Sequence, residues 1–331
     1  MMYYRPLVRH GETRPEGALP LVGGALWFSE VELLQREAPP RIVPVGLVPE
    51  EIRHRLMARR AAIAGLDMTR PQIMGILNVT PDSFSDGGCH NEHEAAVAAA
   101  QRMATEGASI IDIGGESTRP GAKFVPEDEE IERTAPVIAA IRAASSVPVS
   151  IDTRKAPVAM EALDAGAQLI NDVSGFTFDA ALAPLAAQAG APVCVMHSQG
   201  DPETMQEDPR YGNVLLDVYD FLEAQIDRLE ATGVPRDRIV VDPGIGFGKT
   251  EAHNLALLKG LSLFHALGCP ILLGVSRKRF IGEIGQEPQA DKRAPGSIAV
   301  ALAGVAKGVQ ILRVHDVAET AQALRLWQAI R

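Results

Sequence analysis

The chain has 331 residues, of which 46% are apolar, so it can bury the core of one large domain or two ordinary ones, and disorder of the whole chain is excluded. Its formal net charge of −10 argues against nucleic acid or a membrane surface as a partner. Three cysteines without C-x-x-C spacing indicate neither a disulfide framework nor a zinc site, and neither a signal-peptide core nor a membrane-length apolar run occurs, so we expect a cytoplasmic protein.

Residues 1–70 differ in pattern from the rest of the chain. They are rich in Pro, Arg and Glu, and their apolar runs are scattered rather than periodic. We interpret them as an N-terminal extension, a small appendage of strands with one helix over 50–65. It is expected to pack on the outside or the base of the following domain. The sequence assigns it no function.

From residue 71 the sequence alternates short β-branched runs with longer segments of helical spacing. The predicted strands are 72–79, 109–115, 148–153, 169–173, 192–197, 239–245, 270–276 and 311–317. Several helical segments end at a glycine suited to a left-handed cap, among them Gly190 and Gly233. Eight strand-then-helix units over 71–331 predict a (β/α)8 TIM barrel. A doubly wound open sheet is the alternative, but it usually has fewer strands and needs a switch point that we cannot locate.

Polar residues stand at the carboxyl ends of nearly all the predicted strands. They are Asn78, Glu116, Asp152, Asn171, Asp172, His197, Asp242, Ser276, Lys278, Arg313 and His315. A single residue of this kind often only caps a helix or bonds a loop. Because barrel enzymes keep their chemistry at this rim, the whole set predicts an active site there.

The chemical types in this set indicate the kind of ligand. Four side chains offer donors and acceptors suited to the flat edge of a heterocycle with amino, N–H and oxo groups: Asp152, Asn171, Asp242 and Lys278. Arg313 and His315 lie two residues apart, hence on one strand face, and provide the wall that a diphosphate needs. The amide oxygen of Asn78 is suited to complete the shell of a Mg²⁺ ion held mainly by phosphate and water.

Two loops rich in glycine follow the first and second predicted strands, at 80–88 and 116–122. Most such loops are solvated connectors. Because Phe84, Asp86 and Arg119 stand beside the glycines and prolines, we interpret these two as mobile lids that carry reactive side chains.

Two shorter motifs do not carry the function. The stretch at 242–250 ends in GKT, but a P-loop requires glycine at position 243, where the sequence has Pro243. The stretch LVRHGET at 7–13 resembles the signature of histidine phosphatases. That motif belongs on a buried central strand, whereas here Arg5 and Pro6 precede it and the remaining chain has the pattern of a barrel.

Seven sequence blocks in order resemble the dihydropteroate synthase family, over about residues 72–331. The blocks are 74–88, 110–122, 150–153, 170–175, 242–250, 274–282 and 313–317. The stretch 196–206 also resembles the family, with Ser198 where Met is common, a change that we expect to be tolerated. The resemblance implies condensation of 6-hydroxymethyl-7,8-dihydropterin diphosphate with 4-aminobenzoate, giving 7,8-dihydropteroate and diphosphate for folate biosynthesis. It also implies Mg²⁺ as cofactor and a homodimer. Residues 1–70 are longer than the family's usual start.

The resemblance also implies roles for individual residues. The pterin edge is expected at Asp152, Asn171, Asp242 and Lys278. The Arg313 side chain would stack on the pterin face, and His315 and Asn78 would meet the diphosphate and Mg²⁺. The aminobenzoate site is expected to include Thr118, Arg119, Phe247, Ser276 and Lys278, and we add Met196 to the substrate-binding residues. The residues expected to act in catalysis are Asp86, Lys278, Arg313 and His315.

We expect little acid–base chemistry, because an electron-rich dihydropterin can stabilise a methylene cation after diphosphate departs. The hypothesis is a dissociative substitution in which Asp86 faces that cation. Two alternatives remain open: a barrel that transfers a methyl group from methyltetrahydrofolate to a corrinoid protein, and a pterin-binding paralogue without activity. The diphosphate wall disfavours the first, and the intact loops disfavour the second. The sequence leaves open whether sulfonamides, which mimic aminobenzoate, act on the protein.

Overall fold

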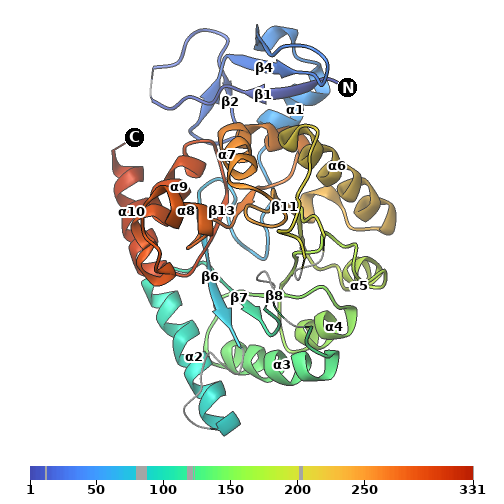
Figure 1. The fold of residues 1–331 in the computed structure, drawn as a ribbon, viewed down its shortest axis with the longest axis vertical. Coiled ribbons are helices and arrows are strands. Elements are labelled where there is room, and N and C mark those ends of the chain that lie inside the picture. The colour runs from blue at the N-terminus through green and yellow to red at the C-terminus, as the bar shows by residue number, and fades with distance from the viewer. Residues whose placement is uncertain (12, 80–87, 118–121, 123, 201–203, 331) are drawn as a thin grey trace.

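The computed structural model describes residues 1–11, 13–79, 88–117, 122, 124–200 and 204–330, with only the backbone described at 88–93. In this part of the chain, an eight-stranded parallel sheet has the order β11-β10-β9-β8-β7-β6-β13-β12 (Figure 1). The strands are β6 (Gln72–Asn78), β7 (Ile110–Gly114), β8 (Val149–Asp152), β9 (Leu169–Asp172), β10 (Val193–Met196), β11 (Ile239–Asp242), β12 (Leu272–Leu273) and β13 (Ile311–Val314). All eight predicted strands are confirmed in position and order.

The sheet closes on itself between its first and last strands. Val241 of β11 and Ile271, just before β12, form a parallel bridge. The Val241 backbone N–H also donates to the Pro270 carbonyl at 2.9 Å. This contact completes the ring, so the predicted TIM barrel is confirmed and the open doubly wound sheet is not observed.

Helices surround the barrel, as Figure 1 shows. They are α2 (Gly88–Glu106), α3 (Glu127–Ala144), α4 (Ala156–Asp164), α5 (Leu182–Ala189), α6 (Val214–Thr232), α7 (Glu251–Gly260), α8 (Arg279–Ile284), α9 (Ala294–Val305) and α10 (Val317–Ala329), with 3-10 turns η3 (Arg236–Arg238), η4 (Leu261–Leu267) and η5 (Ala290–Lys292). Gly190 and Gly233 cap α5 and α6 in the left-handed conformation, as predicted. Among the described helices, none combines the length and the apolar character required to cross a membrane.

The period of two along each strand determines which side chains point into the barrel. One buried cluster contains Met74, Ile110, Leu169, Cys194, Val240, Leu272 and Ile311. Two residues further along their strands stand Ile76, Asp112, Asn171, Met196, Asp242, Gly274 and Arg313. The polar side chains therefore lie inside the barrel, directly above an apolar layer that closes its lower half.

The N-terminal extension forms small antiparallel sheets beside the barrel. Among the described residues, one sheet has the order β1-β4-β5 and another pairs β2 with β3. The elements are β1 (Tyr3–Pro6), β2 (Leu19–Pro20), β3 (Trp27–Phe28), β4 (Glu30–Leu34), β5 (Arg41–Pro44), η1 (Val45–Leu47) and α1 (Glu50–Met57). Figure 1 shows this extension at one end of the molecule, next to α6 and α7. Its strand β1 contacts η4, and Tyr3 donates to Asp220 of α6 at 2.9 Å.

The prediction of one helix over 50–65 is wrong beyond Met57. The residues that follow are good helix formers, but they form no helix because their side chains make tertiary contacts at the base of the barrel instead. Arg60 is buried and donates to the His265 carbonyl at 3.0 Å. Ile63 and Met68 belong to the apolar layer inside the barrel. Burial of these side chains outweighs the helix propensity of the segment, which amounts to a few tenths of a kcal/mol per residue.

Candidate active site

A cavity of about 1400 Å³ opens at the carboxyl ends of the strands. The residues predicted to bind a substrate or Mg²⁺ that the structure describes all line it: Asn78, Asp152, Asn171, Met196, Asp242, Phe247, Ser276, Lys278, Arg313 and His315. Three predicted site residues, Asp86, Thr118 and Arg119, lie outside the described residues, as does most of both predicted lids. The sequence therefore brings together side chains from seven strands or strand ends around one cavity.

An arginine held by two carboxylates forms the floor of the cavity. The Nε of Arg313 donates to Asp112 Oδ2 at 2.6 Å, and its Nη2 donates to Asp152 Oδ2 at 2.6 Å. The amide of Asn171 also donates to Asp112 Oδ2, at 3.1 Å. Asp152 Oδ1 is buried and has no hydrogen-bond partner among the described residues. Because a buried acceptor without a partner costs about 1–3 kcal/mol, this oxygen is suited to accept a ligand N–H.

The electrostatics of this floor are strongly perturbed. Burial raises the pKa of Asp152 to about 7, although the neighbouring Arg313 opposes the shift. Burial by itself would lower the pKa of Arg313, but the carboxylates of Asp112 and Asp152 raise it above its ordinary value. The guanidinium is therefore charged at every physiological pH, whereas Asp152 changes its protonation near neutrality.

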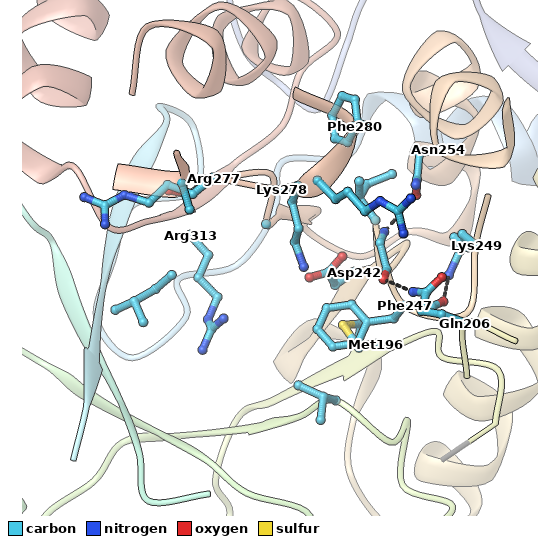
Figure 2. Close-up of a pocket in the computed structure, with 18 of the residues that line it drawn as sticks. Met196, Gln206, Asp242, Phe247, Lys249, Asn254, Arg277, Lys278, Phe280 and Arg313 are labelled. Carbon is cyan, nitrogen blue, oxygen red and sulfur yellow. Dashed lines mark hydrogen bonds between the residues drawn. The ribbon is translucent and has the colours of Figure 1, made fainter. Parts of the chain in front are cut away.

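A second group forms the opposite wall, from β11 and the loop after β12. Burial raises the pKa of Asp242 to about 6, against the opposing effects of the Gly244 N–H and of Lys278. The Nζ of Lys278 lies 4.1 Å from the centroid of the Phe247 ring. Figure 2 shows the end of the Lys278 side chain beside Asp242, with Phe247 and Met196 next to them. A carboxylate, an ammonium and an aromatic face thus meet in one region of the cavity.

Ser276 and His315 form a polar wall near Arg313. The Oγ of Ser276 accepts from the His315 backbone N–H at 3.1 Å and lies 3.0 Å from His315 Nδ1. Neighbouring Arg277 has a left-handed backbone and forms an ion pair with Asp316. In Figure 2 its side chain points away from Lys278 and Asp242. The left-handed turn at Arg277 therefore separates the charged side chains of residues 277 and 278.

The base of the second loop is held by buried ion pairs. Glu116 lines the cavity and accepts from the Val125 backbone N–H at 3.0 Å. Lys155 donates to the Val125 carbonyl and to Glu130 Oε2, each at 2.5 Å. Arg154 also pairs with Glu116. These contacts fix residues 116 and 125, which flank the segment predicted to carry Thr118 and Arg119.

Sequence reasoning missed Asp112 and gave no role to Lys249. Asp112 lies within an apolar run, and the only signal was a carboxylate two residues before the strand end, on the inward face. Asp172 points outward instead and accepts from the backbone N–H groups of Ser174 and Phe176. His197 does not line the cavity but is buried against Lys249, at 2.8 Å. Neighbouring residues at a strand end therefore have different roles: some line the cavity, and others bond only to the protein around them.

Comparison with known proteins identifies similar chains. A family model described as "Pterin binding enzyme" matches residues 74–315. The dihydropteroate synthase of Escherichia coli strain K12 is 47% identical over 264 residues, covering 80% of this chain and 93% of that relative. Two solved structures are similar as well. The Yersinia pestis dihydropteroate synthase with a sulfonamide drug complex is 46% identical, with a TM-score of 0.77, over 82% of this chain and 99% of that one. The Xanthomonas albilineans dihydropteroate synthase with 4-aminobenzoic acid is 45% identical, with a TM-score of 0.77, over 82% and 97%.

Proposed function

The chain belongs to the dihydropteroate synthase family of pterin-binding enzymes, and from that membership we propose how its cavity residues perform the reaction. The reaction is a transfer that joins 6-hydroxymethyl-7,8-dihydropterin diphosphate to 4-aminobenzoate and releases diphosphate, giving 7,8-dihydropteroate for folate biosynthesis. The single observation that carries the residue assignment is the buried Oδ1 of Asp152. It lies beside Arg313 and lacks a protein donor among the described residues.

Asp152, Asn171, Asp242 and Lys278 bind the pterin edge in this proposal. The two carboxylates accept from amino and ring N–H groups, and Asn171 and Lys278 serve the oxo and ring nitrogen acceptors. A flat heterocycle with the opposite pattern would leave the buried Asp152 oxygen unpaired. The cavity thereby selects the pterin by the cost of mismatched polar groups.

Arg313 and His315 face the diphosphate, and Arg313 also stacks on the pterin face. We place Mg²⁺ at Asn78, which lines the cavity. In the described part of the chain, no group of three His, Cys, Asp or Glu side chains is placed to hold a metal ion. A site with one amide ligand fits an ion whose other ligands are phosphate oxygens and water. When bound, the ion supplies positive charge to the leaving diphosphate.

The aminobenzoate lies against Phe247, Ser276 and Lys278, with Met196 on the pterin side and Thr118 and Arg119 from the second loop. Its amine attacks the pterin methylene carbon as the bond from that carbon to the diphosphate oxygen breaks. The amine then loses a proton to solvent. Because the electron-rich dihydropterin carries the developing positive charge, the protein acts mainly through position and charge.

Asp86 faces the developing cation in this mechanism. Replacing it, Asp86→Ala, should lower kcat about a hundredfold while the dissociation constant of the pterin diphosphate changes less than about threefold. The check combines steady-state kinetics with calorimetric binding of the pterin diphosphate. Equal losses in turnover and binding would refute this role for Asp86.

The reaction itself is tested by incubating the chain with pterin diphosphate, Mg²⁺ and 4-aminobenzoate and measuring diphosphate release. Omitting the amine is the control. Release that depends on the amine, with formation of dihydropteroate, supports the proposal. Pterin binding without release would instead identify an inactive paralogue, and methyl transfer from methyltetrahydrofolate would identify the corrinoid-type alternative.

We further propose that the chain works as a homodimer in the cytoplasm. Leu326 on helix α10 and Ile330 just after its end are 63% and 81% exposed, and such apolar side chains favour contact with a second copy. Sedimentation equilibrium of the chain and of the Leu326→Glu variant tests this. A monomeric unaltered chain at micromolar concentration contradicts it.

A further inference from the structure

Lys249 is a buried lysine that the mechanism above does not use. It follows the turn after β11 and is 3% exposed at the edge of the cavity. Its Nζ lies 2.8 Å from His197 Nδ1, and it donates to the His197 carbonyl at 3.2 Å and to the Phe247 carbonyl at 2.9 Å. Burial lowers the pKa of Lys249 well below its ordinary value, but three protein acceptors match the three protons of an ammonium group and favour that charged form. Lys249 therefore lines the cavity with no proton left for a ligand.

The partner of Lys249 is suited to be a fixed acceptor. Burial, with Lys249 as a second cause, lowers the pKa of His197 to about 2, so the ring is neutral. Its ring stands edge-on to Phe221, with centroids 4.8 Å apart, and tilted to Tyr211 at 5.9 Å. A neutral imidazole with Nδ1 facing an ammonium carries its proton on Nε2. The histidine is thus a rigid anchor at the end of β10.

The whole turn between β11 and α7 is fixed to its surroundings. The N–H of Gly246 donates to Asn254 Oδ1 and its carbonyl accepts from Gln206. The carbonyl of Gly248 accepts from the Tyr211 hydroxyl at 2.7 Å. Phe247 stands between these two glycines, and Lys249 holds its carbonyl. The backbone of Phe247 is therefore restrained on both sides and at its own oxygen.

This restraint reaches the substrate cavity through one contact. The ring of Phe247 lines the cavity, and Lys278 Nζ lies 4.1 Å from its centroid. A displacement of the Phe247 carbonyl would move the ring away from the ammonium of Lys278, which would stay beside the carboxylate of Asp242. By contrast, Asp152 is held by Arg313 from another strand, independently of Lys249.

We propose that Lys249, anchored on His197, is a positioning residue that holds Phe247, whose ring lies beside Lys278, in place for the aromatic amine. The inference rests on the proposed function for the identity of that amine. It assigns a role within the same site to Lys249, whose ammonium is bonded to protein acceptors, and to His197, which does not line the cavity. The pterin edge depends on it less, because Asp152 and Asn171 have separate supports and Lys278 has the carboxylate of Asp242 beside it.

The test compares Lys249→Met with the matched control Lys259→Met, an exposed lysine on α7. Binding of 4-aminobenzoate to the enzyme loaded with pterin and diphosphate is measured by calorimetry, as is binding of the pterin diphosphate alone. We expect Lys249→Met to weaken binding of 4-aminobenzoate about tenfold or more, and binding of the pterin diphosphate less than about threefold. Lys259→Met should match the unaltered chain in both.

A second variant keeps the proposal testable if Lys249→Met does not fold. His197→Phe preserves an aromatic ring between Phe221 and Tyr211 but removes one of the three acceptors. It should also weaken binding of 4-aminobenzoate, but by a smaller factor of about threefold to tenfold. In the double variant, the loss of affinity for 4-aminobenzoate should not exceed the loss in Lys249→Met alone. Both substitutions act through the same contact between Lys249 and His197.

Two results would overturn the inference. One is an equal weakening of both ligands, and the other is a fall in Tm with amine affinity unchanged, since either would make Lys249 a purely structural residue. Because the readout is binding, it is separate from turnover. An unaltered chain that binds both ligands but releases no diphosphate would refute the proposed reaction, while the binding comparison would still decide the role of Lys249.

Discussion

At the scale of single residues, the protonation of Asp152 should make pterin binding depend on pH. Its pKa is raised to about 7 by burial, and the protonated carboxyl cannot accept two pterin N–H groups as a carboxylate does. Pterin affinity should therefore rise as pH increases through 7 and level off above it, with a slope of about tenfold per pH unit between pH 6 and 7. Calorimetry with 6-hydroxymethyl-7,8-dihydropterin measures this without the titrating diphosphate.

The matched variant for this pH dependence is Asp152→Asn. It cannot ionise, so the change near pH 7 should disappear, leaving only the step from Asp242, whose pKa is raised to about 6. Binding should also be weaker at all pH values, because Arg313 loses one carboxylate. An unaltered chain whose pterin affinity is constant between pH 6 and 8 would contradict the assignment of Asp152 to the pterin edge.

Asp112 is expected to act through Arg313. It is fully buried and pairs with the guanidinium at 2.6 Å, so Asp112→Asn keeps the shape but removes the charge. We expect kcat/KM to fall by about tenfold to a hundredfold, the value of a charge-assisted hydrogen bond of about 1.5–3 kcal/mol. Asp208→Asn, at an exposed position on the outer rim, is the control and should leave kcat/KM unchanged. Equal kinetics for both variants would exclude Asp112 from the site.

The residue scale also shows what the sequence can predict. Residues at strand ends, such as Asn171 and Asp242, were predictable because carboxyl ends of parallel strands meet at one rim. Asp112 was not, because one residue within an apolar run does not reveal that an arginine far along the chain neutralises it. His197 and Lys249 are similar cases. Their types are visible, but only the fold shows that they bond to each other rather than to a ligand.

At the scale of elements, the turn between β11 and α7 depends on Gly244. Its φ is +66°, and a Cβ added there would lie 1.9 Å from the His197 carbonyl oxygen. Gly244→Ala should lower the free energy of unfolding by at least about 2 kcal/mol and weaken 4-aminobenzoate as well. In Gly46→Ala, an added Cβ meets nothing within 4 Å, so stability should stay within about 0.5 kcal/mol. Urea denaturation compares the two, and a Gly244 variant as stable as the Gly46 variant would contradict this geometry.

Elements were predictable to the extent that their periodicity came from the barrel itself. Each strand has a buried, β-branched pattern because it faces the interior on one side and the helices on the other. The helix prediction was wrong after Met57 for a related reason. The composition of this segment favours a helix, but two of its apolar side chains, Ile63 and Met68, are buried inside the barrel, and no local pattern indicates that burial.

At the scale of the whole molecule, the extension and the barrel share one core. Ile63 is fully buried in the apolar layer two residues below the site, together with side chains of seven strands. Ile63→Ala should therefore cost about 2–5 kcal/mol of stability, while both KM values stay within about twofold because the layer lies below the ligands. Ile42→Ala, at a residue 62% exposed on the edge strand β5, should change neither. Thermal unfolding together with steady-state kinetics distinguishes the outcomes. If Ile63→Ala melted like Ile42→Ala, the extension would not seal the base of the barrel, and a truncated chain would be expected to fold without it.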